Sequence, residues 1–199
     1  MMMVSKLIIV VVGAIPLWAV PAQAATFNVD FLDPLVLGMP AADSTTGTVE
    51  EDVSDTTFFR RSPWDTTSHP DETYTAVYGD SSATYNFASS MSGLSLLWGS
   101  VDTYNRIIFY SGVTLVDSLT GTQVLDAGLG VPEGEGYANI TISALLFDRA
   151  VFISDTLNSF EYSNLVVTSI PLPAAFFLYG AGMVILSLVG RIKRRKPGL

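Results

Sequence analysis

Charge divides this chain into three segments. All 19 carboxylates lie between Asp30 and Glu161, where only four arginines oppose them. Lys6 is the one charged residue before Asp30, and five of the ten lysines and arginines fall within the last nine positions. Because apolar, uncharged runs flank the acidic middle, the sequence predicts one water-exposed domain between two segments that interact with membranes.

Residues 1–24 have the layout of a secretory signal peptide. Lys6 precedes an apolar run, and the triplet Ala22-Gln23-Ala24 follows that run. Signal peptidase accepts small side chains at the outer positions of such a triplet, so we expect cleavage between Ala24 and Ala25. A retained N-terminal anchor is the alternative, but the apolar run is short for a membrane span and no flanking charges follow it.

Residues 174–190 form an uncharged apolar run that is predicted to cross a membrane. These 17 residues extend about 26 Å as a helix, and residues 170–173 lengthen the segment. The basic tail 191–199 follows at once and contains Arg191, Lys193, Arg194, Arg195 and Lys196. Positive charge holds that end in the cytoplasm, so the acidic middle is expected outside. A buried core helix is the alternative, but the run offers no polar face to solvent.

The C-terminal segment 170–199 combines the motif Pro171-Leu172-Pro173-Ala174, one apolar helix and a basic cluster, in that order. It resembles the PEP-CTERM sorting signal in its VPLPA variant, with Ile170 where that variant usually has valine. The resemblance implies a membrane-anchored precursor in the inner membrane of a Gram-negative bacterium, with a periplasmic domain. An exosortase would cut this precursor near the proline motif, and the protein would pass to the cell surface or extracellular matrix.

The acidic middle, residues 25–169, is long enough to fold as one domain without disulfides, and the chain has no cysteine. Short β-type runs punctuated by Gly, Asp, Asn and Ser recur along it, and apolar residues alternate in 94–98 and 140–146. No stretch of a dozen residues shows a helical apolar period. The sequence therefore predicts an all-β fold, a jelly-roll-like antiparallel β-sandwich, flanked by a signal-peptide helix and a transmembrane helix.

Nine strands are expected in this domain, at residues 26–32, 73–78, 84–88, 94–98, 104–110, 113–117, 137–147, 151–154 and 160–168. The strands at 94–98 and 104–110 are predicted to pair as a hairpin through a turn at 99–103. Because both carry bulky residues on each face, we expect them to be covered on both sides. Residues 38–57, rich in Asp, Glu, Ser and Thr, are predicted to form an exposed loop.

No cofactor is expected, with calcium as the alternative. Glu50-Glu51-Asp52 supplies the hard oxygen ligands that Ca²⁺ prefers, but the spacing of a known calcium loop is missing. The glycine-rich segment 131–136 lacks the lysine and helix start of a phosphate-binding loop, so we interpret it as a turn.

Catalysis is not expected either. The single histidine, His69, and the lack of cysteine exclude sites that need two imidazoles or a thiolate. Serine is abundant, but no G-x-S-x-G elbow accompanies it. Carboxylate pairs such as Asp71/Glu72 and Glu133/Glu135 could serve a glycosidase, yet such pairs arise by chance among 19 carboxylates.

Two tryptophans of the domain lead to different expectations. Trp98 lies in an alternating strand and is predicted to be core. Trp64 lies in a loop, where it could stack on a sugar or plug the end of the sandwich, and the plug is favoured.

Together these patterns favour a secreted, exosortase-processed surface or matrix protein with a structural or adhesive role in the envelope, exopolysaccharide or biofilm. A calcium-assisted carbohydrate-binding module is the alternative, and a polysaccharide hydrolase comes third. The expected partners are signal peptidase, an exosortase-type membrane enzyme, the membrane and possible exopolysaccharide ligands. Nucleic acid is not expected, because four arginines against 19 carboxylates leave the middle at −15, which repels phosphates.

Overall fold

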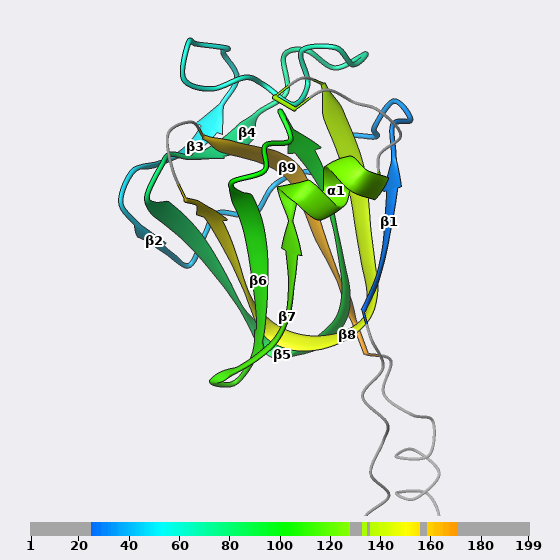
Figure 1. Cartoon of the computed structure of the whole chain (residues 1–199). Coiled ribbons are helices and arrows are strands. Elements are labelled where there is room, and N and C mark those ends of the chain that lie inside the picture. The colour runs from blue at the N-terminus through cyan, green and yellow to red at the C-terminus, as the bar shows by residue number, and fades with distance from the viewer. Residues whose placement is uncertain (1–24, 128–132, 135, 156–158, 171–199) are drawn as a thin grey trace, which may run out of the picture.

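A computed structural model describes residues 25–127, 133–134, 136–155 and 159–170 (Figure 1). Nearly all of its regular structure is antiparallel β-sheet, so the all-β prediction is confirmed. The elements are β1 (Thr26–Asp30), β2 (Ser44–Thr46), β3 (Val49–Val53), β4 (Tyr74–Val77), β5 (Ser81–Gly99), β6 (Asn105–Ser111), β7 (Thr114–Thr120), α1 (Gly121–Ala127), β8 (Tyr137–Ser154) and β9 (Phe160–Ser169).

Two long strands, β5 and β8, run through both layers of this sandwich-like fold. The first part of β5 pairs with the last part of β8, and the last part of β5 pairs with the first part of β8. The register shifts between Asn86 and Gly93, where the two strands turn over together. Because such irregularities bend strands, one continuous sheet folds back on itself here. The sequence treats each long strand as two separate ones.

Each layer is completed by strands that flank the β5–β8 pair. One layer contains β2, the first part of β5, the last part of β8, β6 and β7. The other contains β1, the first part of β8, the last part of β5, β9, β4 and β3. This arrangement leaves the sandwich with two different ends.

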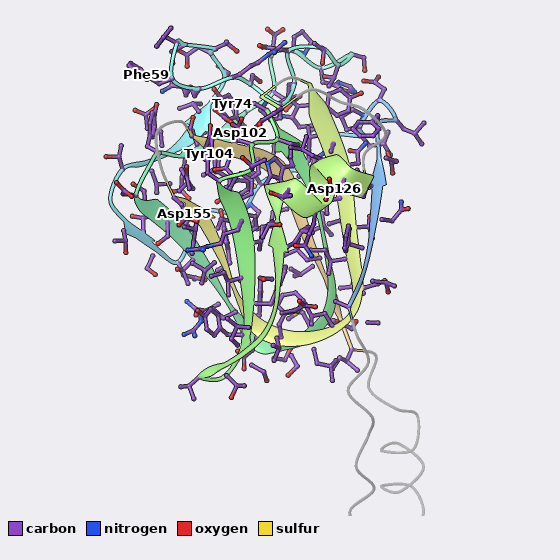
Figure 2. All side chains as sticks on the ribbon, viewed as in Figure 1. Phe59, Tyr74, Asp102, Tyr104, Asp126 and Asp155 are labelled. Carbon is purple, nitrogen blue, oxygen red and sulfur yellow. The ribbon has the colours of Figure 1, made fainter. Side chains whose placement is uncertain are left out.

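We call one end the loop pole and the other the chain-end pole. The loop pole consists of residues 54–73, 100–104 and 133–134, and Figure 2 labels Phe59, Asp102 and Tyr104 there. The chain-end pole consists of residues 25–27, 87–93, 110–116, 143–149 and 166–170. The described chain begins and ends at this second pole (Figure 1).

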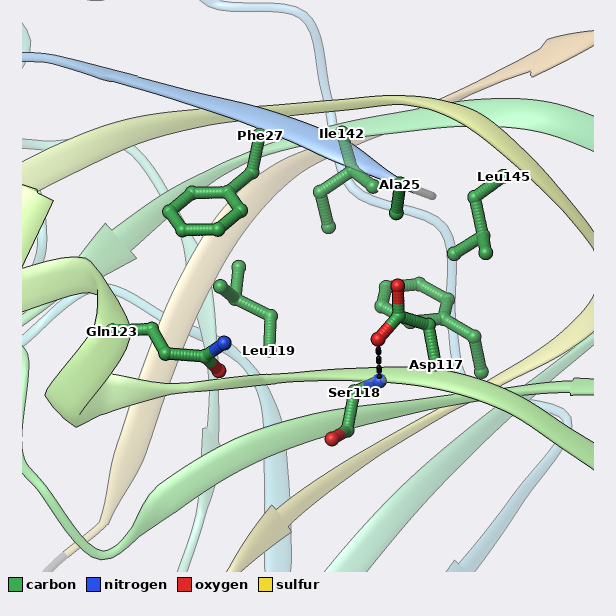
Figure 3. Close-up of a pocket in the computed structure, with 9 residues that line it drawn as sticks. Ala25, Phe27, Asp117, Ser118, Leu119, Gln123, Ile142 and Leu145 are labelled. Carbon is green, nitrogen blue, oxygen red and sulfur yellow. Dashed lines mark hydrogen bonds between the residues drawn. The ribbon is translucent and has the colours of Figure 1, made fainter. Parts of the chain in front are cut away.

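The outer strands β1 and β7 of the two layers approach each other around a small cavity. Its volume is about 100 Å³, and it is lined by Phe27 of β1, Leu119 of β7 and Gln123 of α1, among others. Figure 3 shows these side chains around the space, with Ala25 at its margin. The first residues of the described chain therefore pack onto the core.

Helix α1 is short, and its start is capped. Thr120 Oγ1 accepts a hydrogen bond from Gln123 N at 3.3 Å, and Gln123 Oε1 accepts one from Thr120 N at 2.9 Å. This reciprocal pair is a capping box of the T-x-x-Q type. No helix is predicted here from the sequence, because seven residues are too few to show an apolar period.

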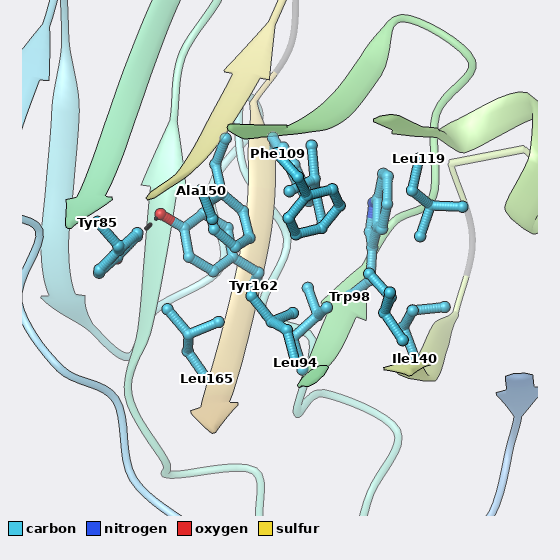
Figure 4. Packing of buried hydrophobic residues seen from close by; sticks show 14 of the residues in the cluster. Tyr85, Leu94, Trp98, Phe109, Leu119, Ile140, Ala150, Tyr162 and Leu165 are labelled. Carbon is cyan, nitrogen blue, oxygen red and sulfur yellow. Dashed lines mark hydrogen bonds between the residues drawn. The ribbon is translucent and has the colours of Figure 1, made fainter. Parts of the chain in front are cut away.

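The main core lies between the two layers and is rich in aromatic residues (Figure 4). Tyr162 and Phe152 stack with ring centroids 4.2 Å apart, and the hydroxyls of Tyr162 and Tyr85 lie 3.1 Å apart. Pairing satisfies these polar groups, which would otherwise be costly to bury. Trp98 is fully buried beside Phe160, as predicted from its strand.

A second apolar cluster covers the outer face of the β4–β9–β5 layer. It contains Trp64, Tyr74, Ala76 and Leu97. Trp64 is 1% exposed and its Nε1 donates to Thr73 O at 3.1 Å, so it is buried as the plug interpretation requires, but it packs on this outer face and not in the core between the layers. The loop that carries Pro63 and Trp64 can approach β5 this closely because residue 99 is glycine. A Cβ at that position would lie 2.7 Å from Pro63 Cβ. The prediction that both 94–98 and 104–110 are covered on both faces is supported for 94–98. It is wrong for 104–110, where buried and half-buried residues alternate along β6.

The predicted hairpin of 94–98 with 104–110 is wrong. Strand β8 lies between β5 and β6 in the sheet order, and β6 pairs with β7 and β8. The last part of β5 and β6 belong to different layers, so residues 100–104 cross from one layer to the other. Both strands have an apolar face because they bury it against the same core from opposite sides.

The predicted loop at 38–57 is partly wrong, since β2 and β3 lie within it. Both are short outer strands, exposed in β2 and exposed or half-buried in β3, which explains why their composition is polar. Exposed strands of this kind lack the alternation on which strand prediction depends.

Candidate functional site

The loop pole contains a cavity of about 260 Å³. It is bounded by the loop that contains residues 56–61, by the crossing segment 100–104 between β5 and β6, and by the start of β9. The lining residues are Thr56, Thr57, Phe58, Phe59, Arg60, Arg61, Ser100, Asp102, Gly134 and Glu161. Two carboxyls, two arginines and two phenylalanines thus meet at one place, although they are far apart in the sequence.

Glu161 is the most unusual residue of this cavity, because its carboxyl is 2% exposed. It sits in β9 between Ala76 of β4 and Gly99 of β5. Its Oε1 accepts from Arg61 N at 3.0 Å, and its Oε2 accepts from Ser100 Oγ at 2.8 Å. These bonds attach the 54–61 loop and the crossing segment to the central sheet.

Ser159 provides the third contact of Glu161. Its Oγ lies 2.5 Å from Glu161 Oε1 and 2.6 Å from Phe59 O. A serine hydroxyl has one hydrogen, so it donates to one of these oxygens at a time. A protonated Glu161 satisfies the second contact by donating to Ser159. Burial raises the pKa of Glu161 to about 7 against the lowering effect of its hydrogen bonds, which agrees with a carboxyl that is mostly protonated below pH 7.

The crossing segment holds a second partly buried carboxyl, Asp102. Burial raises its pKa, while the hydrogen bond from the Tyr104 hydroxyl at 2.7 Å lowers it and the charge of Glu133 raises it. Ser100, two residues earlier, has a φ of 33°, which is rare outside glycine. Strained backbone of this kind is often found at functional sites, which makes this segment a candidate for one.

Arg60 fixes the loop that forms the rim of the cavity. Its guanidinium pairs with Glu50, donates to Asp55 Oδ1 at 2.6 Å and donates to the Tyr78 hydroxyl at 2.8 Å. The side chain is 12% exposed. Because Glu50 belongs to β3, the polar outer strand and the rim of the cavity form one connected unit.

Phe58 and Phe59 project from the same rim into solvent. They are 93% and 58% exposed, and their rings meet edge to face at 5.2 Å. The exposed rings offer apolar faces to a ligand, whereas the two carboxyls of the cavity already bond within the protein.

Most of the site residues predicted from the sequence do not line the loop-pole cavity. Ala25 is half-buried at the start of β1. Ala24 and the predicted cleavage after it, the sorting motif Pro171-Leu172-Pro173-Ala174, and the basic residues Arg191, Lys193, Arg194, Arg195 and Lys196 lie outside the described residues. So do the signal peptide 1–24 and the predicted span 174–190.

The acidic residues proposed as calcium ligands bond to the protein itself. Glu50 pairs with Arg60, and Glu51 Oε1 accepts from Ala42 N at 2.6 Å. Within the described ranges, no group of three or more metal-ligating side chains occurs. Glu133 Oε1 accepts from Thr103 N and Oγ1 at 3.1 and 2.6 Å, which fixes a turn.

Three other residues considered from the sequence do not reach the cavity. Asp71 and Glu72 lie in the loop before β4, and His69 stands edge-on to the ring of Trp64 at 6.2 Å. None of these three residues lines the loop-pole cavity.

Glu161 was missed by sequence reasoning, although a signal was present. It lies between Phe160 and Tyr162 in a run predicted to be a strand, and its neighbours on both sides in that strand are buried. A single carboxylate inside an apolar, central strand must be paired or neutral. Nothing in the sequence indicates its partners Arg61 and Ser100, which are distant in sequence, although Ser159 lies two residues away.

Comparison with protein-family models, with curated proteins and with solved structures finds no match. In the part of the chain that the structure describes, no helix is both long and apolar enough to cross a membrane.

Proposed function

We propose that this protein is a secreted, exosortase-processed surface or matrix protein whose acidic β-sandwich has a structural or adhesive role. In this proposal the jelly-roll-like domain is exported behind a signal peptide. It is held in the inner membrane by residues 174–190 and released after cleavage near Pro171-Leu172-Pro173-Ala174. The sequence of both ends supports the proposal, and so does the position of those ends in the fold.

The observation that carries the proposal is that both ends of the domain emerge at one pole. Thr26, Ser143, Gly93 and Thr168 lie in one row across β1, β8, β5 and β9. Three strand spacings of about 4.8 Å place the two chain ends about 14 Å apart. A domain with this arrangement can fold outside the membrane with the apolar segments on both sides inserted, before signal peptidase removes the first of them.

Processing is tested in a host that has the cognate sorting enzyme. We expect the double variant Pro171→Ala/Pro173→Ala to insert normally but to accumulate in the inner membrane at its uncut mass. Pro197→Ala, which also removes a proline from the tail but not from the motif, should be trimmed like the native chain. Mass spectrometry of the membrane and surface fractions decides, and normal trimming of the double variant would overturn the sorting assignment.

Carbohydrate binding is a second candidate, and the exposed phenylalanine pair favours it. The earlier candidate for stacking, Trp64, is buried and cannot contact a sugar. Phe58 and Phe59 are exposed at the cavity rim instead. If they bind sugars, Phe58→Ala/Phe59→Ala should abolish retention on a glycan array, whereas Val113→Ala at the opposite pole should not. Equal retention of the two variants would reject this candidate.

A further inference from the structure

The chain-end pole differs from the rest of the domain in its charge. Its five segments, 25–27, 87–93, 110–116, 143–149 and 166–170, contain one carboxylate and one basic residue, Asp148 and Arg149. The chain has 19 carboxylates, so the acidic charge is concentrated away from this pole.

Both charged groups of the pole have partners within the fold. The two carboxylate oxygens of Asp148 accept from Gly112 N at 3.0 and 2.9 Å, which closes the β6–β7 turn. The Arg149 guanidinium lies over the ring of Tyr110, 4.2 Å from its centroid. The pole therefore presents a surface that is close to electrically neutral.

Apolar side chains project from this neutral surface. Val113, at the tip of the β6–β7 turn, is 95% exposed, and Leu115 and Leu146 are 57% and 55% exposed. Strand pairing shows that these residues and the chain end belong to one surface. Tyr110 pairs with Arg149, two residues along β8 from Phe147, and Met91 pairs with both Phe147 and Ser169.

The short length of chain between β9 and the predicted span indicates that the membrane lies next to this surface. Ile170 ends the described domain, and the predicted span begins at Ala174. Four Cα–Cα steps cover at most about 14 Å, so the pole cannot move far from the bilayer while the chain is anchored. Any bilayer with anionic lipids repels the acidic remainder of the domain, but it does not repel a neutral pole.

We propose that, in the anchored precursor, the chain-end pole rests on the outer surface of the inner membrane, with Val113 and Leu146 in the headgroup region. This proposal rests on the membrane anchoring in the proposed function. The bilayer then sets the orientation of the domain, with the loop pole and its cavity directed away from the membrane.

The chain's lack of cysteine makes the test direct, because each single-cysteine variant carries one label. The full chain is reconstituted in phosphatidylethanolamine–phosphatidylglycerol vesicles with an environment-sensitive fluorophore at Val113→Cys. Phe58→Cys is the matched control, since Phe58 is 93% exposed at the opposite pole. We expect the Val113→Cys label to be quenched by nitroxide lipids and to be quenched by iodide several-fold less than the control label.

A third label, Ser187→Cys in the predicted span, separates the two proposals. If it is quenched by deep nitroxide lipids but the Val113→Cys label is as open to iodide as the control, the anchoring stands and the pole proposal fails. Protection of Val113→Cys from iodide without lipid quenching means that protein covers the pole, which also overturns it. If the Ser187→Cys label is not quenched by lipid, anchoring and pole contact both fail.

Discussion

The two poles of the sandwich are built from the same strands but differ in almost every physical respect. The loop pole has a cavity and a buried Glu161 with three hydrogen-bond partners. The chain-end pole has tight turns, two charged residues that bond internally and exposed apolar side chains. Because one fold contains both, its ends can face two different environments.

The difference also concerns how each pole is held together. The loop pole depends on polar bonds between segments that are distant in sequence, so it is sensitive to protonation and to loss of single partners. The chain-end pole depends on strand continuity through the β5–β8 fold-over, and its exposed side chains contribute little to stability. Mutations that probe the two ends should therefore have unequal effects.

The largest difference is expected between Glu161→Ala and Asp148→Ala. Removing the buried carboxyl leaves Ser100 Oγ and the Arg61 amide without this acceptor, while Ser159 keeps Phe59 O, and the loss should cost about 3–5 kcal/mol. Removing the more exposed one should cost about 1 kcal/mol or less. Urea unfolding of the full chain in mild detergent measures both, and equal losses would contradict the contrast between the poles.

The pH dependence should come from the loop pole. The pKa of Glu161 is raised from its ordinary value of 4.5 to about 7, so the folded state keeps a proton that the unfolded state loses in this range. Stability should therefore be highest below pH 4.5 for this group, and should fall by up to about 3 kcal/mol as pH rises to 7.

Glu161→Gln supplies the control for this pH effect, since an amide does not titrate. The slope between pH 4.5 and 7 should become much smaller in the variant, with unfolding followed by fluorescence. Asp102, whose pKa is also raised, contributes in the same direction and accounts for what remains. Glu133, whose pKa is lowered, acts only at lower pH, where its contribution is lost as pH falls. An undiminished slope in Glu161→Gln would assign the effect to another group.

A smaller effect is expected at the plug of the outer cluster. Trp64→Phe keeps an aromatic ring but loses the bond from Nε1 to Thr73 O, which should cost about 1–2 kcal/mol. Phe58→Leu, in the same loop but exposed, should leave the unfolding free energy unchanged. If Trp64→Phe is also neutral, the loop is not anchored by this residue.

The smallest effect should be at the chain-end pole. Val113→Asn changes a 95% exposed side chain and should alter the unfolding free energy by less than about 0.5 kcal/mol. Leu119→Asn, in the adjoining strand but 3% exposed, should cost several times more because it buries an amide in the core. A large loss in Val113→Asn would show that this side chain packs against the fold.

Sequence patterns predict the parts of this fold that repeat locally. Alternation marks residues 94–98 and 140–146 as strands, and it places Trp98 in the core, because period two follows from strand geometry. Pairing is not local. The hairpin error at 94–110 arises since two apolar strands next to each other in sequence can join different layers as easily as they can pair.

The candidate site is harder to predict than the strands. Glu161 is recognisable as a carboxylate within an apolar strand, but its partners Arg61, Ser100 and Ser159 are set by how three segments meet. The short strands β2 and β3 are missed because their side chains face water on most sides. The proposed sorting motif, by contrast, rests on contiguous residues, and that is why it can be proposed before any fold is known.

Strand β9 also determines how this domain would transmit a mechanical load. It lies between β4 and β5 and leads directly to Ile170, where the tail begins. Hydrogen bonds between antiparallel strands run perpendicular to the strand axis, so a pull on Ile170 along β9 shears many of them at once instead of opening them one by one. Drag on an attached cell or matrix would be spread over the centre of the sheet and not over an edge.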